Sequence, residues 1–79
     1  LLARARLAGV DHPDIVAGLT ALGRGDTEQG LTHLVDAVRV AGPDLREDLR
    51  AALLGVFAEL GEHHPLATRF RRRLAQALY

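Results

Sequence analysis

The sequence contains no cysteine, and it also lacks methionine, tryptophan, lysine, serine and asparagine. Without cysteine the chain has no disulfide, no thiolate nucleophile and no cysteine-ligated zinc or iron–sulfur centre, so the usual stabilisers of small secreted domains are missing. Its 79 residues suffice for one domain at most, and at this size the hydrophobic core leaves only a small margin of stability. We therefore expect a single domain that is stabilised by close packing.

Long hydrophobic runs and an excess of one charge are missing as well. The longest apolar run spans residues 51–58, whereas a membrane-spanning helix needs about 20 apolar residues. Ten arginines balance ten acidic residues, and 48% of the residues are hydrophobic, a composition typical of a soluble globular protein. Arginine without lysine indicates a GC-rich bacterial genome, and we expect a cytoplasmic protein. Because the chain starts at Leu1 without methionine or a signal pattern, we expect it to be a piece of a longer protein.

Hydrophobic periodicity predicts helices throughout the chain and no strand. Glycine and proline mark the turns between them, as at Gly9, Gly25 and Pro43. The predicted helices span residues 2–8, 13–23, 27–41, 43–60 and 65–78.

The fourth predicted helix has two apolar faces. Its main stripe includes Leu53 and Phe57. Ala51, Leu54 and Ala58 form a second face of small side chains on a 100° helical wheel. Since a helix of this kind can pack against neighbours on two sides, we expect it to be the central element.

Two of the four histidines stand directly before proline. His12 precedes Pro13, and His64 precedes Pro65. Because proline disfavours the helical conformation for the residue before it, both histidines suit the N-cap position of a helix.

The histidines show no metal-binding pattern. His63 and His64 are adjacent and therefore diverge by about 100° on a helix, and there is no His-x-x-x-His pair whose rings converge on one ion. His33 is expected on the solvent side of its helix, in a local pair with Asp36. We expect no metal site.

Charge is divided unevenly along the chain. Residues 1–64 hold six arginines and ten acidic residues, a net charge of −4, whereas residues 65–79 hold four arginines and no acid, a net charge of +4. A basic helix is a feature of nucleic-acid-binding proteins. However, Arg71 and Arg73 flank the apolar stripe at opposite edges, and the cations also suit the negative end of the helix dipole. Binding to nucleic acid is therefore disfavoured, and so is binding to a membrane surface, because the core needs the apolar face.

No enzyme chemistry is indicated. Serine and cysteine are absent, the threonines have no base at a recognisable spacing, and no glycine-rich phosphate loop follows a strand. Carboxylates such as Glu47 and Asp48 lie near the start of a helix, where they complement its dipole. We expect no catalytic residue and no cofactor.

Short antiparallel helices with such turns predict a stack of helix hairpins. Residues 14–43 resemble one tetratricopeptide repeat of about 34 residues. Gly18 stands at the glycine of the first helix, Leu34 at a large apolar position and Ala37 at the small position of the second helix. One position where the repeat prefers alanine and two where it prefers an aromatic residue depart from the pattern: Gly30, Asp14 and Ala21. We expect an all-α, tetratricopeptide-like stack of four to five helices.

The C-terminal half carries a more specific pattern. Residues 52–66 read ALLGVFAELGEHHPL, residues 70–75 read FRRRLA, and the chain ends in Tyr79. This resembles the C-terminal tetratricopeptide-type domain of bacterial thioredoxin-fold chaperones, the chaperedoxin or YbbN-like family. In that family an LL-x-x-F-x-x-L-G helix precedes HPL and an arginine-rich helix that finishes in an aromatic residue. The resemblance covers residues 8–79 and is most specific from residue 52.

The resemblance implies a non-catalytic module that holds unfolding client proteins and delivers them to the chaperonin. It also implies a thioredoxin-like domain upstream in the same protein. The candidate partner-binding surface is the outer face of the last helix: Thr68, Arg69, Arg72, Ala75, Gln76 and Tyr79. Tyrosine and arginine are residue types favoured at binding hot spots. The alternative is a helical scaffold or self-association domain of a larger bacterial regulatory protein, with Ala51, Leu54 and Ala58 as the packing face.

Overall fold

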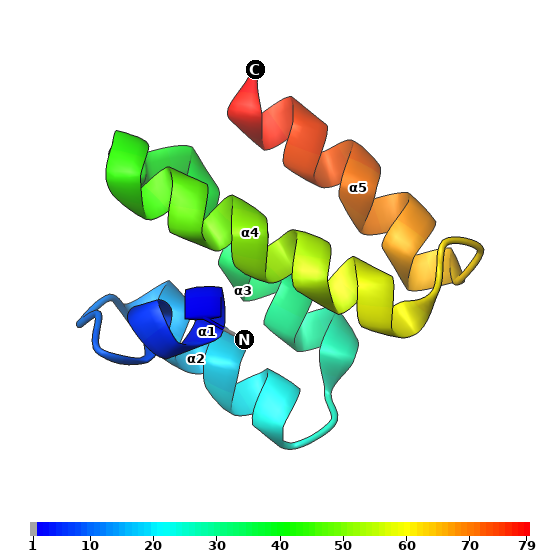
Figure 1. Cartoon of the computed structure of the whole chain (residues 1–79), viewed down its shortest axis with the longest axis horizontal. Coiled ribbons are helices and arrows are strands. Elements are labelled where there is room, and N and C mark those ends of the chain that lie inside the picture. Colours follow the sequence, from blue (N-terminus) through cyan, green and yellow to red (C-terminus); the bar gives the residue numbers. More distant parts are fainter. Residues whose placement is uncertain (1) are drawn as a thin grey trace.

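The computed structural model describes residues 2–79, with side chains from residue 4 onward, and this part of the chain contains helices and no strand (Figure 1). The helices are α1 (Leu2–Ala8), α2 (Pro13–Gly23), α3 (Thr27–Val40), α4 (Pro43–Leu60) and α5 (Pro65–Leu78). The predicted all-α class is confirmed. The third helix ends at Val40, one residue before the predicted end, because Ala41 has an extended backbone and serves as its C-cap.

Two helices begin at a histidine that is followed by proline. His12 and His64 both have extended backbones. In each, the ring Nδ1 accepts a hydrogen bond from the backbone N–H two residues further on, at 3.2 Å from Asp14 and 3.1 Å from Leu66. Proline is tolerated at the first helical position because its missing N–H has no partner there in any case. The predicted N-cap roles of both histidines are confirmed.

The α2–α3 hairpin depends on glycine. Gly18 of α2 and Gly30 of α3 are both buried in the contact between the two helices. Gly25, in the turn, has a φ of +82°, in the left-handed region that glycine adopts without strain. Asp26 then caps α3 by accepting a hydrogen bond from the N–H of Gln29 at 3.4 Å.

Helix α3 occupies the middle of the molecule. It contacts α2, α4 and α5, whereas α4 contacts α1, α3 and α5. In Figure 1, α4 crosses in front of α3, with α5 along one side of it and α1 and α2 on the other. The predicted second face of α4 is not covered within the described chain, because Ala51, Leu54 and Ala58 remain exposed. The central position belongs to α3 as much as to α4.

All five helices contribute to one hydrophobic core. Leu7 of α1 and Ile15 of α2 are fully buried, and Phe57 and Phe70 are its largest side chains. Helix α3 supplies Leu31, Leu34, Val35, Ala37 and Val38. No polar or charged residue is buried among those that the structure describes. Since each large apolar side chain contributes about 1.5–3 kcal/mol when it is fully buried, packing of this kind is what stabilises a chain without disulfides.

Candidate protein-interaction surface

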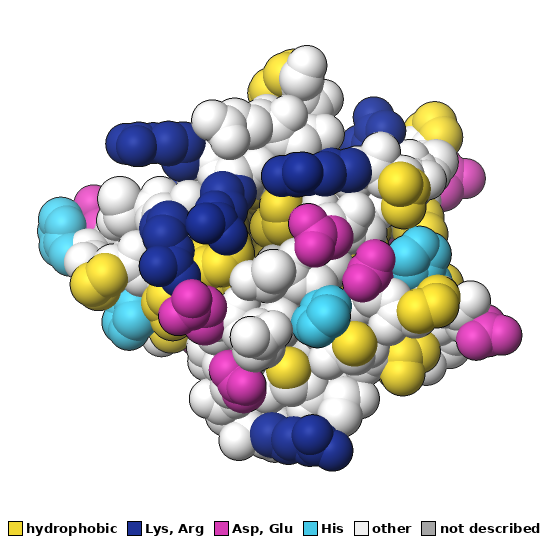
Figure 2. Space-filling view, turned by 180° about the vertical axis from the view of Figure 1, so that it is seen from behind, with side chains coloured by type: hydrophobic (Ala, Val, Ile, Leu, Met, Phe, Trp, Pro, Cys, Tyr) yellow, Lys and Arg dark blue, Asp and Glu magenta, His cyan; other side chains and the backbone are white. Residues whose placement is uncertain are grey.

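Helix α5 has one buried face and one polar face. Ala67, Phe70 and Leu74 are buried against the other helices. The four arginines of α5 are exposed. Figure 2, seen from behind, shows arginine side chains gathered at the upper left, where α5 lies. The arginine-rich segment therefore packs into the core through one face and presents positive charge on the other.

The structure divides the six predicted partner-binding residues into two groups. One group is exposed at positions i, i+4, i+7 and i+11, which share one side of a helix: Thr68, Arg72, Ala75 and Tyr79. The other two lie beside α3. Arg69 forms an ion pair with Glu28 at 3.0 Å, and Gln76 lines a groove between α3 and α5. The predicted outer face is therefore narrower than the sequence suggests, and two of its members belong to a different surface.

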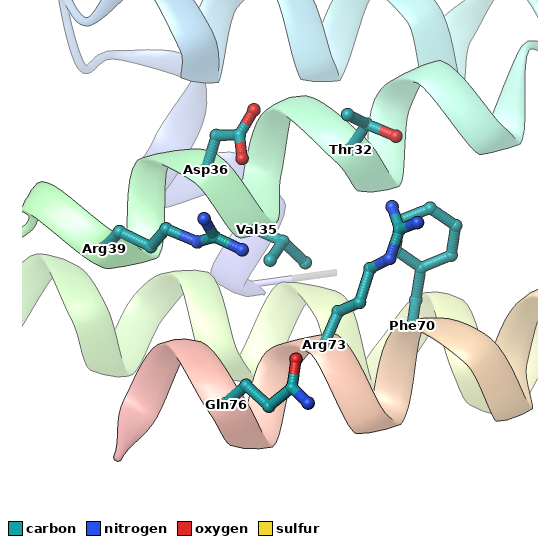
Figure 3. A pocket seen from close by; sticks show the side chains of 7 residues that line it. All are labelled: Thr32, Val35, Asp36, Arg39, Phe70, Arg73 and Gln76. Carbon is teal, nitrogen blue, oxygen red and sulfur yellow. The ribbon is translucent and has the colours of Figure 1, made fainter.

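The groove between α3 and α5, here called the α3–α5 groove, has a volume of about 290 Å³. Its lining residues are Thr32, Val35, Asp36 and Arg39 from α3, and Phe70, Arg73 and Gln76 from α5. Figure 3 shows Arg39 and Arg73 reaching into it from the two helices, with Val35 between them. Val35 is 2% exposed and Phe70 is fully buried, so these two side chains form a closed floor under a polar rim.

Two arginines of α5 lie against one aromatic ring. The guanidinium carbons of Arg69 and Arg73 are each 5.0 Å from the centroid of Phe70. The guanidinium of Arg71 lies 5.6 Å from the ring of Phe57. Cation–π contacts of this kind contribute about 0.5–1 kcal/mol at exposed sites. They also restrict the arginine side chains, so the positive charges beside the groove have defined positions.

Sequence reasoning missed the α3 side of this groove. Thr32, Asp36 and Arg39 recur at i, i+4 and i+7, and they therefore share one face of α3. That polar stripe was visible in the sequence. What the sequence did not contain is the information that α5 packs beside it.

His33 is paired across two helices and not within its own. Its Nδ1 lies 3.3 Å from the Oδ1 of Asp14. The predicted local pair with Asp36 is wrong, because the packing of α2 against α3 brings Asp14 within reach. His33 also lines a second groove, of about 360 Å³, between α2 and α3, together with residues such as Thr20 and Arg24.

The adjacent histidines near the last helix have separate environments. His64 uses its Nδ1 as the N-cap of α5, whereas His63 is exposed and its Nε2 lies 4.0 Å from Glu62. Within residues 4–79 no group of three or more His, Asp or Glu side chains is arranged to hold a metal ion. No helix in the described part of the chain is long and apolar enough to span a membrane.

The second face of α4 is open to solvent. Leu54 is 40% exposed and lies between the exposed Ala51 and Ala58. Two ion pairs join α1 to α4, from Arg6 to Asp48 at 3.2 Å and from Arg4 to Glu59 at 3.4 Å. Because Ala51, Leu54 and Ala58 are exposed, this face of α4 is free for contact with another molecule or another domain.

The comparison with known proteins yields one family. A family model described as tetratricopeptide repeat matches residues 4–79, which include four of the helices completely and most of α1. No curated protein and no solved structure matches the chain.

Proposed function

Because this chain belongs to the tetratricopeptide repeat family, whose domains generally mediate protein–protein interaction and are typically non-catalytic, we propose that it is the interaction module of a bacterial thioredoxin-fold chaperone or co-chaperone. In this role it binds unfolding client proteins, the chaperonin, or both, in the cytoplasm. A thioredoxin-like domain precedes it in the full protein. The support for this finer assignment is the resemblance of residues 52–79 to the chaperedoxin or YbbN-like family.

The residues that carry this resemblance divide into core and surface. Phe57, Phe70 and Leu74 are buried, and packing alone accounts for them. Tyr79 is fully exposed, with a relative accessibility of 102%, and Arg72 is exposed seven positions before it. Packing within this chain gives no reason for an aromatic residue at that place. An unburied tyrosine on the same helix side as an arginine is the observation that carries the proposal, because both residue types are frequent at binding hot spots.

The proposed docking surface is the outer side of α5. It consists of Thr68, Arg72, Ala75 and Tyr79, with Arg69 and Gln76 at the edge that faces α3. Thr68 and Ala75 are small, so they leave room for a partner to approach the backbone of α5 between the two larger side chains.

Retention of purified chaperonin on the immobilised chain tests this proposal. We expect the double variant Arg72→Ala/Tyr79→Ala to retain about thirtyfold less chaperonin than the unaltered chain, since a hot-spot pair contributes about 2 kcal/mol or more. Both side chains are exposed, so the variant keeps its fold. Truncation after Leu74 is a poorer test, because it removes Ala77 and Leu78, which pack against the core.

Arg24→Ala is the matched control, since it removes one exposed arginine at the far end of α2. It should retain as much chaperonin as the unaltered chain. Equal retention by the double variant and the control would overturn the proposed docking surface.

A second candidate function is self-association through the open face of α4. The observation that favours it is the exposure of Leu54, at 40%, between two exposed alanines. Sedimentation at high micromolar concentration should then show a dimer, and Leu54→Asp should abolish it without loss of helix content. A strict monomer under these conditions would exclude this function.

A further inference from the structure

The α3–α5 groove holds two arginines that form no ion pair within the described chain. Arg39 and Arg73 enter the groove from its two sides. Neither takes part in any ion pair or side-chain hydrogen bond among the described residues. Arg69, one turn before Arg73, differs because its guanidinium is bound to Glu28. The groove therefore presents ten N–H donors on two guanidinium groups, and these donors are free for a ligand.

Arg73 is already ordered for binding. Its guanidinium lies 5.0 Å from the centroid of the Phe70 ring, and that ring is fully buried in the core. A free arginine side chain loses about 2 kcal/mol of rotamer entropy when it is held in one place. Because part of this entropy is lost before any ligand arrives, binding to Arg73 costs less than binding to an unrestrained arginine.

The remaining rim residues match a peptide main chain. Asp36 is an acceptor for backbone N–H groups, and Gln76 can both donate and accept. The Thr32 hydroxyl donates to the Glu28 carbonyl oxygen at 2.8 Å, so it can only accept from a ligand. With one acidic side chain and two arginines, the rim has a net charge of +1. An extended acidic peptide satisfies both features, since its carboxylates bind the arginines and its amides bind Asp36.

Nucleic acid fits this groove less well. A phosphate backbone has no N–H donor for Asp36 and would be repelled by it. Bases bind single-strand sites by stacking on exposed aromatic rings, but Phe70 is fully buried. The charge and the donor pattern therefore favour a protein segment.

We propose that the α3–α5 groove binds an acidic segment of a partner protein, with one carboxylate held between Arg39 and Arg73 and the adjoining main chain bonded to Asp36. This inference rests on the proposed function only in so far as the chain binds proteins. The groove is a separate surface from the outer side of α5. One partner can therefore contact both surfaces, or two partners can bind at the same time.

Fluorescence anisotropy of a labelled peptide of alternating glutamate and alanine tests the proposal on the 79-residue chain. A peptide with glutamine in place of glutamate and a 12-nucleotide single strand are the comparison probes. We expect Arg39→Gln and Arg73→Gln each to raise the Kd of the acidic peptide by about five- to tenfold, because charge-assisted hydrogen bonds are lost. Arg73→Lys should give a smaller loss, since it keeps the charge but not the planar fork.

Arg24→Gln is the matched control, because it removes the same charge from the other groove. It should change the Kd by less than about twofold, and the glutamine peptide should not bind. An equal loss for Arg24→Gln, absence of binding by the acidic peptide, or tighter binding of the oligonucleotide through the same arginines would each overturn the proposal.

The outcome is distinguishable from that of the chaperone proposal. If the acidic peptide binds as expected but chaperonin is not retained, the groove proposal is supported and the chaperone proposal is overturned. If chaperonin retention depends on Arg72 and Tyr79 but no acidic peptide binds, only the groove proposal is overturned.

Discussion

Gly18 and Gly30 bring the backbones of α2 and α3 into direct contact, and the relationship is reciprocal. A Cβ atom on Gly18 would lie 3.1 Å from the carbonyl oxygen of Gly30, and one on Gly30 would lie 3.0 Å from the carbonyl oxygen of Gly18. Each such Cβ would also meet a leucine, Leu34 in the first case and Leu22 in the second. The position where a tetratricopeptide repeat prefers alanine is therefore occupied by glycine here because the helices approach more closely than alanine allows.

Gly30→Ala should destabilise the protein by about 1–3 kcal/mol, the usual cost of overpacking a closed contact. The added Cβ would lie 2.7 Å from the side chain of Leu22 and close to the backbone of α2, and the backbone cannot move without shifting a whole helix. Thermal unfolding measures this as a fall in Tm of about 4–8 °C for each kcal/mol in a domain of this size. A Tm equal to that of the unaltered chain would show that α2 moves away at no cost.

Gly55→Ala should have the opposite sign. Gly55 lies inside α4, is exposed, and has nothing within 4 Å of a Cβ atom built on it. Alanine at such a site stabilises a helix by about 0.4–1 kcal/mol, because it restricts the unfolded chain without a clash. Chemical denaturation of this variant beside Gly30→Ala separates the effect of helix propensity from that of the α2–α3 contact. A destabilised Gly55→Ala variant would mean that a second molecule covers this part of α4.

His64→Ala should cost about 1 kcal/mol, since it removes the N-cap acceptor of α5. The lost bond is the one from the Leu66 N–H to Nδ1, at 3.1 Å. His64→Asp should restore most of the stability, because aspartate is a good N-cap and its charge suits the helix N-terminus. The control is His63→Ala, which alters an exposed neighbour with no capping role and should change the free energy of unfolding by less than about 0.5 kcal/mol. Equal effects at both histidines would contradict the capping role.

The Arg69–Glu28 ion pair should contribute little to stability. Its side chains are 45% and 60% exposed, and exposed pairs are worth about 0.2–1 kcal/mol. A double-mutant cycle with Arg69→Ala and Glu28→Ala should give a coupling energy in this range that disappears in about 1 M salt, where charges are screened within about 3 Å. A parallel cycle between Arg69 and Glu47, which is paired with Arg50 instead, should give no coupling. Coupling that persists in high salt would show that this pair acts through packing and not through charge.

The fold was predictable because its signals are local. His12 and His64 stand directly before proline and cap α2 and α5. Gly25 sits in the turn that needs a positive φ. The stripe of α3, with Leu31, Leu34, Val35 and Val38 all buried, follows helical periodicity alone. Local backbone preferences and apolar spacing act within a few residues of one another, so a single sequence carries them in full.

The candidate surfaces were less predictable because they join distant parts of the chain. The arginine-rich face of α5 was apparent from its composition. The division of this face into an outer side and the α3–α5 groove depends on Glu28 and Arg39 of α3. These two residues lie beside α5 in the fold but are far from it in the sequence. The pairing of His33 with Asp14 depends in the same way on the hairpin of α2 and α3.

The sequence by itself determined where the helices begin and end to within one residue, which face of each is apolar, and that the last helix is basic whereas the rest of the chain is acidic. Only the tertiary structure decided which helices touch: that Gly18 and Gly30 meet, that the second face of α4 stays open, and that Arg39 and Arg73 share one groove. The physical reason is that helix formation depends on neighbours three or four residues apart, whereas helix packing depends on the complementary shapes of surfaces that the chain brings together only when it is folded.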